Sequence, residues 1–428
     1  MELLGNMIKI LIYMSIIASC IGANVIAIDL GFFQLSLFRF LIIAISIFSL
    51  INFLLIKKGV ITLKKGPNSY SIKFMVFWFF YSILTLGWVH DYVGWIKSVY
   101  FIGLGLLSIL IISNYFNKST DILKAFKIMS IMILFHNVIG WYEILSKNYI
   151  FLSADKTAYF ARFGLPVSSF NNPNDYAMFL LFSIGILYVC SVNSKSKNFT
   201  LYYISLIISS LTLLVFTTSR ANIVGVLLGL VFYIALSFKK RKTRNGLIIS
   251  LMIAIVIISI FPNYFSDLIT IIGDNLYIKL SEGMGSDVTR LNLIKNGMFF
   301  LFSTLGFGTG AGNIEYWMEN NSLYNTFGVV NMHNWWIEIL VGYGLIVFIL
   351  YVWFYIKLLR HIVRKFKLSR EKIDHSISLG IGFSMVGFII GSLSSSSNLN
   401  NEWLWIFWAI AIAYQGIEID NKEPCKTT

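Results

Sequence analysis

The chain has 428 residues, of which 57% are hydrophobic and 13% are charged, and its formal net charge is +14. Soluble domains contain roughly 25% charged and 45–50% apolar residues, so this composition excludes a soluble enzyme. The basic residues lie in short loops between apolar blocks, where they set membrane orientation, and we therefore do not predict nucleic acid as a partner.

The apolar blocks follow one another along the whole chain, and each is close to the roughly 20 residues that a helix needs to cross a bilayer. They predict an all-α, polytopic membrane protein with about twelve transmembrane helices, in which residues 1–428 form a single membrane domain. The predicted spans are roughly 7–28, 33–56, 72–89, 97–113, 122–145, 174–193, 200–217, 221–238, 246–262, 336–356, 376–396 and 401–417.

The loops that follow the even-numbered spans are all basic. Lys57 and Lys58 follow the second span, and a run of basic residues from Lys239 to Arg244 follows the eighth. Because positively charged loops stay in the cytoplasm, we expect both termini to be cytoplasmic. Two longer loops, at about 146–173 and 263–335, then face outward, and the second is the larger extracytoplasmic loop of the protein.

The larger outward loop contains a predicted helix from Asp287 to Ser303, which Ser286 or Asp287 can cap. One side of this helix is apolar at helical spacing, and we expect it to rest on the membrane or on the bundle. The residues on that side are Val288, Leu291, Ile294, Met298 and Phe302.

Glycines occupy every second position from Gly306 to Gly312. A nucleotide-binding loop would end in Gly-Lys-Ser or Gly-Lys-Thr, and this segment does not. We instead expect a flexible turn that brings the loop helix back toward the span at 336–356.

Arg39 lies just inside the outer end of the second span. A charge within the membrane costs roughly 2.5–3.5 kcal/mol on insertion scales, so it usually has a use. Arg39 either snorkels to the interface or pairs with Asp29, or it contacts an anion in an outward-facing cavity. The sequence leaves these alternatives open.

Two further arginines lie on the outward side. Arg220 follows Thr217, Thr218 and Ser219 in a short turn, and the hydroxyl groups beside its guanidinium group suit phosphate oxygens. Its alternative role is that of an interfacial arginine in a capping turn. Arg290 lies in the first turn of the loop helix, where free N–H groups favour anions, unless it pairs with Asp287 on a solvated face.

His333 lies immediately before the span at 336–356. Imidazole can accept a proton from a hydroxyl group near neutral pH, and Glu338 or a backbone carbonyl is positioned to orient it. Alternatively, His333 is an interfacial histidine in an aromatic belt with Trp335 and Trp336.

We predict no metal and no cofactor. The three cysteines, Cys20, Cys190 and Cys425, lie far apart and show no metal-ligand or disulfide spacing, so we interpret them as structural thiols. The acidic residues on the outward side also share no spacing; they are Asp267, Asp274, Glu282, Asp287, Glu315 and Glu319.

Four short motifs share this outward side. They are Phe170-Asn-Asn-Pro-Asn-Asp175 before a span, Thr217-Thr-Ser-Arg220 opening a span, the glycine series ending in Gly312-Asn313, and His333-Asn334 opening a span that contains Gly344. In this order the motifs resemble those of the O-antigen ligase and polymerase superfamily. Many members carry an acidic residue two positions before the last glycine. Here that position is Gly342, and whether Glu338 substitutes for it stays open.

The resemblance implies a GT-C-like arrangement and a metal-independent, inverting glycosyltransferase. Such enzymes act on glycans linked to undecaprenyl diphosphate at the outer face of the bacterial inner membrane. Carried over by position, Arg220 and Arg290 would hold the diphosphate, and His333 would activate or orient the acceptor hydroxyl. Further substrate-binding residues are expected at Arg39, Asn334, Trp335 and Glu338.

We therefore predict a polymerase that joins repeat units of a capsular, O-antigen-like or teichuronic-acid-like polysaccharide. Its expected partners are the lipid-linked glycan, the bilayer, and flippase and chain-length regulator proteins. One alternative is a ligase that transfers the glycan to a lipid or protein acceptor. Two alternatives from other classes are a flippase for the lipid-linked oligosaccharide and an assembly subunit without catalytic activity.

Overall fold

Long helices make up most of the structure, a computed structural model that describes residues 2–29, 31, 34–56, 66–238, 245–248, 251–252, 286–395 and 398–418. The long helices are α1 (Glu2–Ile21), α2 (Leu37–Ile56), α3 (Ser69–Leu84), α4 (Tyr92–Tyr115), α5 (Ser119–Ser146), α7 (Pro173–Val192), α8 (Lys197–Phe216), α9 (Arg220–Ser237), α14 (Trp335–Leu368), α15 (Lys372–Gly391) and α16 (Glu402–Gly416). The shorter elements are the antiparallel strands β1 (Ala27–Asp29) and β2 (Gln34–Ser36), and the helices α6 (Ala154–Phe163), α12 (Ser286–Ser303) and α13 (Ile314–Asn321).

The predicted spans agree with these helices. Every span except the ninth coincides with a described helix, and the ninth, at 246–262, lies mostly outside the described residues. Eight of the described helices are long and apolar enough to cross a membrane, and α1 and α2 contain the shorter apolar stretches Met7–Ile21 and Leu37–Ile51. The protein is therefore an integral membrane protein. The number of twelve spans stays a prediction.

Two helices end at places that differ from the prediction. Helix α1 ends at Ile21, and not near residue 28, because Gly22 adopts a left-handed φ of 78°, a conformation that terminates helices. Helix α14 continues past residue 356 to Leu368 through a basic, amphipathic stretch. Because that stretch is strongly charged, its polar side is suited to water at the membrane surface.

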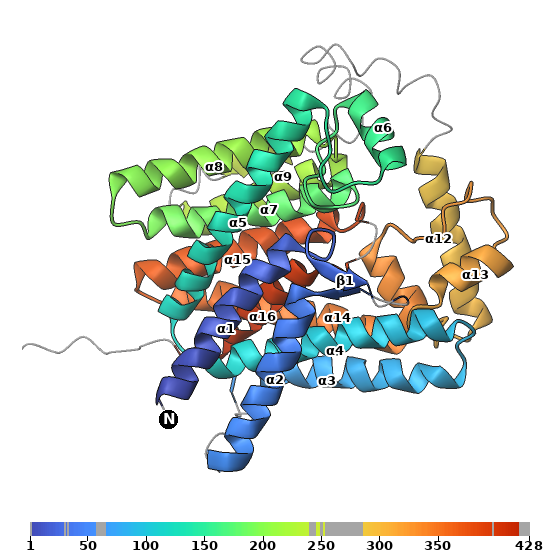
Figure 1. Cartoon of the computed structure of the whole chain (residues 1–428), viewed down its shortest axis with the longest axis horizontal. Coiled ribbons are helices and arrows are strands. Elements are labelled where there is room, and N and C mark those ends of the chain that lie inside the picture. The colour runs from blue at the N-terminus through green and yellow to red at the C-terminus, as the bar shows by residue number, and fades with distance from the viewer. Residues whose placement is uncertain are drawn as a thin grey trace, which may run out of the picture.

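The helices α2, α4, α7, α9, α14 and α16 all begin at the same end of the bundle, which we call the loop end (Figure 1). Figure 1 shows α3, α4 and α14 running side by side, and α12 lying across their ends. Hydrogen bonds described below connect the starts of α7, α9 and α14. The residues proposed from the sequence therefore gather at the loop end.

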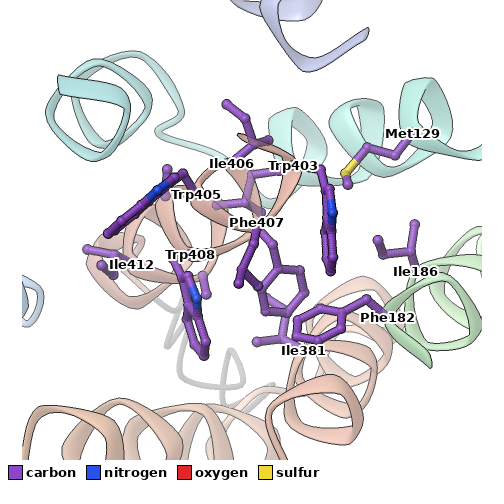
Figure 2. Packing of buried hydrophobic residues seen from close by; sticks show 14 of the residues in the cluster. Met129, Phe182, Ile186, Ile381, Trp403, Trp405, Ile406, Phe407, Trp408 and Ile412 are labelled. Atoms are coloured by element: carbon purple, nitrogen blue, oxygen red, sulfur yellow. The ribbon is translucent and has the colours of Figure 1, made fainter. Parts of the chain in front are cut away.

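Helix α16 forms the centre of the core, and its residues are buried along almost its whole length. Figure 2 shows its aromatic side chains between helices α5, α7 and α15. The Phe407 ring meets the Phe182 ring of α7 at 4.6 Å, and the Trp408 ring meets the Phe388 ring of α15 at 5.5 Å. Because offset and edge-to-face aromatic pairs add to the energy of burial, this cluster fixes the packing of these helices.

Glycine contacts bring α7, α9 and α15 close together. A Cβ atom at Gly185 of α7 would lie 2.6 Å from the carbonyl oxygen of Gly380 in α15, and one at Gly225 of α9 would lie 2.7 Å from that of Gly387. Small residues at helix interfaces allow backbones to approach in membranes, where lipid supplies little hydrophobic driving force. These contacts hold α7 and α9, which both begin at the loop end, against α15.

Helix α12 matches the predicted loop helix, but its most buried residues are not those of the predicted side. The buried residues of α12 include Leu293 and Phe300, which contact α13 and the start of α14 through a second small core. On the predicted apolar side, Leu291 is 51% and Phe302 is 73% exposed, whereas Ile294 and Met298 are half-buried. The predicted side is therefore covered only in part, and contact of its exposed residues with the membrane stays a prediction.

The loop before α7 is fixed by buried polar side chains of α5. The Glu143 carboxylate accepts hydrogen bonds from the backbone N–H groups of Val167 and Ser168, both at 2.8 Å. The His136 ring bonds to the Ser168 hydroxyl at 2.9 Å and to the carbonyl oxygen of Cys20 at 2.8 Å. This network ties the loop to α5 and to the end of α1, and so it positions the beginning of α7.

Candidate active site at the loop end

A short polar turn after α15 connects the starts of α9 and α14. We call residues 392–395 the serine turn, because three of its four residues are serines. The carbonyl oxygen of Ser392 accepts a hydrogen bond from the backbone N–H of Trp335 at 3.1 Å. The hydroxyl groups of Ser394 and Ser219 lie 3.4 Å apart. The segments that carry His333 and Arg220 are therefore bonded to one and the same turn.

Helix α9 is also tied to the start of α7. The Asn222 amide donates to the Ser219 hydroxyl at 2.9 Å, to the Ser394 hydroxyl at 3.3 Å and to the carbonyl oxygen of Asn174 at 3.4 Å. Ser395 in turn donates a hydrogen bond to the Asp175 carboxylate. Arg220, the first residue of α9, thus begins at a junction between three helices.

Two non-glycine residues with left-handed backbones stand at these helix starts. Thr218, two residues before Arg220, has a φ of 57°, and His333 has a φ of 48°. Such conformations cost about 1–3 kcal/mol each and persist where the surrounding structure enforces them, often at functional sites. Both segments that the sequence motifs indicated thus contain one of the six left-handed non-glycine residues of the described chain.

Arg290, the fifth residue of α12, lies close enough to His333 to affect its protonation. Burial lowers the pKa of the His333 imidazole, and the positive charge of Arg290 lowers it further. His333 is therefore neutral at physiological pH and able to accept a proton. The predicted alternative, pairing of Arg290 with Asp287, concerns a side chain outside those that the structure describes.

The sequence left open what orients His333. Within the described part of the chain, no hydrogen bond joins its ring to the Glu338 carboxylate or to a backbone carbonyl. Glu338 lies in the first turn of α14 and experiences the negative charges of Glu315 and Asp175. The described contacts therefore do not identify Glu338 as the residue that orients His333.

The glycine series of residues 306–312 packs along a break in α14. Gly344 has a φ of 80° and a ψ of 175°, which interrupts the helix. The backbone N–H groups of Thr309 and Gly310 donate to the carbonyl oxygens of Val341 and Gly342 at 2.8 and 3.0 Å. The break would leave these carbonyl groups without partners in an apolar environment, and the glycine series supplies the missing donors.

The other side of the glycine series is held by the turn between α3 and α4. The Asn313 side chain accepts hydrogen bonds from the backbone N–H groups of His90 and Asp91, both at 2.8 Å. The Trp88 indole donates to the carbonyl oxygen of Gly308 at 3.0 Å. The expected return toward α14 is confirmed, but the segment is clamped on both sides, and a flexible turn does not describe it.

Two glycines of this series form a matched pair that tests how tightly the series packs against the break in α14. Gly306 and Gly308 both have a φ of 82°, but a Cβ atom at Gly308 would lie 2.6 Å from the backbone of both Val341 and Gly344, whereas one at Gly306 meets nothing within 4 Å. Gly306→Ala should cost only the left-handed backbone, about 1–2 kcal/mol. Gly308→Ala should lower the melting temperature in detergent more than Gly306→Ala does, because its Cβ atom would also clash with the backbone of α14. Equal losses would show that the contact with the break in α14 is not tight.

Arg39 pairs with a residue that the sequence analysis did not name. Its Nε donates to the Glu402 carboxylate at 2.7 Å, and its guanidinium group lies over the Phe101 ring at 4.9 Å. It also donates to the carbonyl oxygen of Gln34. Arg39 lies on the wall of a cavity at the loop end, as the cavity alternative expected, but pairing with Asp29 is wrong because Glu402 occupies that role.

The structure gives Asn334 and Trp335 contacts within the protein. The Asn334 side chain caps α14 by accepting a hydrogen bond from the backbone N–H of Ile337 at 3.3 Å. The Trp335 ring is 4% exposed, and its indole N–H donates to the Tyr351 hydroxyl at 2.9 Å. Both side chains therefore position the start of α14, and we do not include them among the proposed substrate contacts.

Comparison with known proteins supports the resemblance drawn from the motifs. Residues 204–352 match the O-antigen ligase family, a stretch that contains Arg220, Arg290, His333 and the glycine series. The chain is also 29% identical over 412 residues to the teichuronic acid biosynthesis protein TuaE of Bacillus subtilis (strain 168). The aligned residues make up 94% of this chain and 83% of the relative. Both comparisons thus support the similarity to the O-antigen ligase and polymerase superfamily that the motifs indicated.

Sequence reasoning missed three groups of residues that organise the candidate site. The serine turn was assigned to the end of a membrane span, although its run of serines was a signal for a polar turn. Asn313 appeared in a motif without a role, and Glu402 was not considered.

Among the described residues no cluster of three or more His, Cys, Asp or Glu side chains is arranged for a metal, and Cys20 and Cys190 are buried thiols. Cys425 lies outside the described residues.

Proposed function

We propose that this protein is a metal-independent, inverting glycosyltransferase that joins repeat units linked to undecaprenyl diphosphate into a surface polysaccharide. In this proposal the chain crosses the bacterial cytoplasmic membrane twelve times in a GT-C-like arrangement, with both termini in the cytoplasm. The loop end then faces outward. The observation that carries the proposal is the junction of the Arg220 and His333 segments at the serine turn, with Arg290 beside His333.

The kind of polysaccharide is suggested by the relative. A protein named for teichuronic acid biosynthesis is similar over nearly the whole chain. Among the capsular, O-antigen-like and teichuronic-acid-like polymers that the motifs allow, this similarity favours the teichuronic-acid-like polymer.

The reaction breaks the bond between the anomeric carbon of the donor glycan and the diphosphate oxygen. The acceptor hydroxyl oxygen attacks the same carbon from the opposite face, which inverts its configuration. The hydroxyl proton passes to the neutral His333 imidazole, and the electron pair of the broken bond leaves with undecaprenyl diphosphate. A sugar hydroxyl is a weak nucleophile, so a positioned base contributes about 10²–10⁴-fold to the rate.

The two arginines have a complementary role in this reaction. Negative charge grows on the diphosphate as the bond breaks, and fixed guanidinium groups stabilise it without reorganising. Arg220 is the first residue of α9 and Arg290 is the fifth of α12, so both lie near helix starts, where the helix dipole adds to the attraction for an anion. Burial and the charge of Arg290 also keep His333 unprotonated, because both lower the pKa of its imidazole.

A ligase is the nearest alternative, because the matched family is described as O-antigen ligase. It would use the same donor chemistry but transfer the glycan to a lipid or protein acceptor. A flippase is favoured by one observation, the break of α14 at Gly344, since transporters often contain broken helices. Transport sites lie near the middle of the membrane, however, whereas the candidate residues here gather at the loop end.

Deletion of the gene in the source organism tests these functions, with surface and lipid-linked glycans separated on a gel. Loss of long polymer with persistence of a single lipid-linked repeat unit is the result expected for a polymerase. Full-length polymer that stays on its lipid carrier would identify a ligase. An unchanged pattern, in a strain without a second copy of the gene, would contradict both and return attention to transport.

A further inference from the structure

A polar cavity of about 470 Å³ lies at the loop end, beside the candidate active site. Its wall is formed by the end of α1, the β1–β2 hairpin, the starts of α2, α4 and α16, and the loop before α7. Arg220, Arg290 and His333 are not among the described residues of this wall. Ligand pockets of about 300–1,000 Å³ are typical of small-molecule sites, so this cavity has room for sugar residues.

The charges of the wall disfavour a phosphate group. Three carboxylates, those of Asp29, Asp175 and Glu402, face two cationic side chains, those of Arg39 and Lys97. The Arg39 guanidinium group is engaged by Glu402 at 2.7 Å and stacks over Phe101. Because the carboxylates outnumber the cationic groups, and one of the two cations is already paired, a diphosphate would bind poorly in this cavity.

The Glu402 carboxylate is held within the wall by Arg39 and Ser36. Its side chain is 4% exposed, and its Oε1 accepts hydrogen bonds from Arg39 and Ser36 at 2.7 Å each. Its Oε2 is buried without a partner among the described residues. Glu402 therefore fixes Arg39 in the wall and adds negative charge there, which suits neutral hydroxyl groups better than an ionised phosphate.

We propose that this cavity is a glycan subsite for the hydroxyl-rich, phosphate-free sugars of the substrate, with the polar side chains of its wall forming hydrogen bonds to sugar hydroxyls. This inference rests on the proposed function. The subsite is connected to the candidate active site, because Asp175 on its wall holds Ser395 of the serine turn, and Ser394 contacts Ser219 beside Arg220. The sugars and the diphosphate are thus bound on two sides of one turn.

Ala23 allows a test that removes no charged or hydrogen-bonding side chain. It lies on the cavity wall in the turn after α1, so Ala23→Phe should fill part of the cavity, and Ala23→Ser is the matched control. Two probes are added separately to the full-length protein in detergent: inorganic pyrophosphate, and a phosphate-free oligosaccharide released from the organism's surface polysaccharide. Binding is measured from the ligand-dependent rise in melting temperature.

We expect the oligosaccharide to bind wild type and Ala23→Ser equally and to bind Ala23→Phe at least tenfold more weakly, while pyrophosphate binds all three alike. Unchanged oligosaccharide binding to Ala23→Phe, or a loss of pyrophosphate binding in that variant, would overturn the subsite. Asn400→Phe, at an exposed wall position, replaces Ala23→Phe should the latter not fold. If the oligosaccharide binds as expected but pyrophosphate binds to none of the three proteins, the proposed function is contradicted instead.

Discussion

His333→Ala is expected to lower the rate of glycan transfer by about 10²–10⁴-fold, the contribution of a positioned general base. The reason is that no other histidine of the described chain stands at the junction with Arg290 and the serine turn. The measurement is formation of polymer from the lipid-linked repeat unit by purified enzyme across a range of pH. The melting temperature in detergent, recorded in parallel, shows whether the variant is folded.

The pH profile separates a base from a residue that only supports the structure. Burial and Arg290 both lower the pKa of His333, so the wild-type rate should fall only as the pH drops below the ordinary histidine value of about 6.5. In His333→Ala this acidic decline should disappear from the residual activity. A variant that is slow but keeps the same acidic decline would show that another group accepts the proton.

Much of the fold was predictable because its signals are local. Each apolar block has the length and hydropathy of a membrane span, and even the loop helix at 287–303 was found from its capping residues and its spacing. The face by which α12 packs was not predictable in this way. Leu291 and Phe302 are as apolar as the buried Leu293 and Phe300, and only the position of α13 and α14 decides which side is covered.

The candidate site was predictable as a set of segments, but its connections were not. The motifs around Arg220 and His333 are local and lie at helix starts, so sequence placed them on one side of the membrane. Their junction at the serine turn depends on how α15 packs between α9 and α14. Glu402 lies more than 360 residues from Arg39, and no local spacing could have joined them.

Breaking the Arg39–Glu402 pair is expected to destabilise the protein by about 3–5 kcal/mol, because removal of one partner leaves a buried charge without compensation. The pair is suited to this test, since the two side chains are only 7% and 4% exposed and lie 2.7 Å apart. Arg39→Met should therefore lower the melting temperature in detergent strongly. It should also reduce the amount of protein that inserts into the membrane.

The double variant Arg39→Met/Glu402→Gln provides the control. Glutamine removes the negative charge but keeps an oxygen that can accept the hydrogen bond from Ser36, which lies 2.7 Å from Glu402. We expect the double variant to regain most of the stability that Arg39→Met loses, because neither buried charge remains. If both variants melt alike, the loss comes from the packing of Arg39 on Phe101, and the ion pair contributes little to the stability of the loop end.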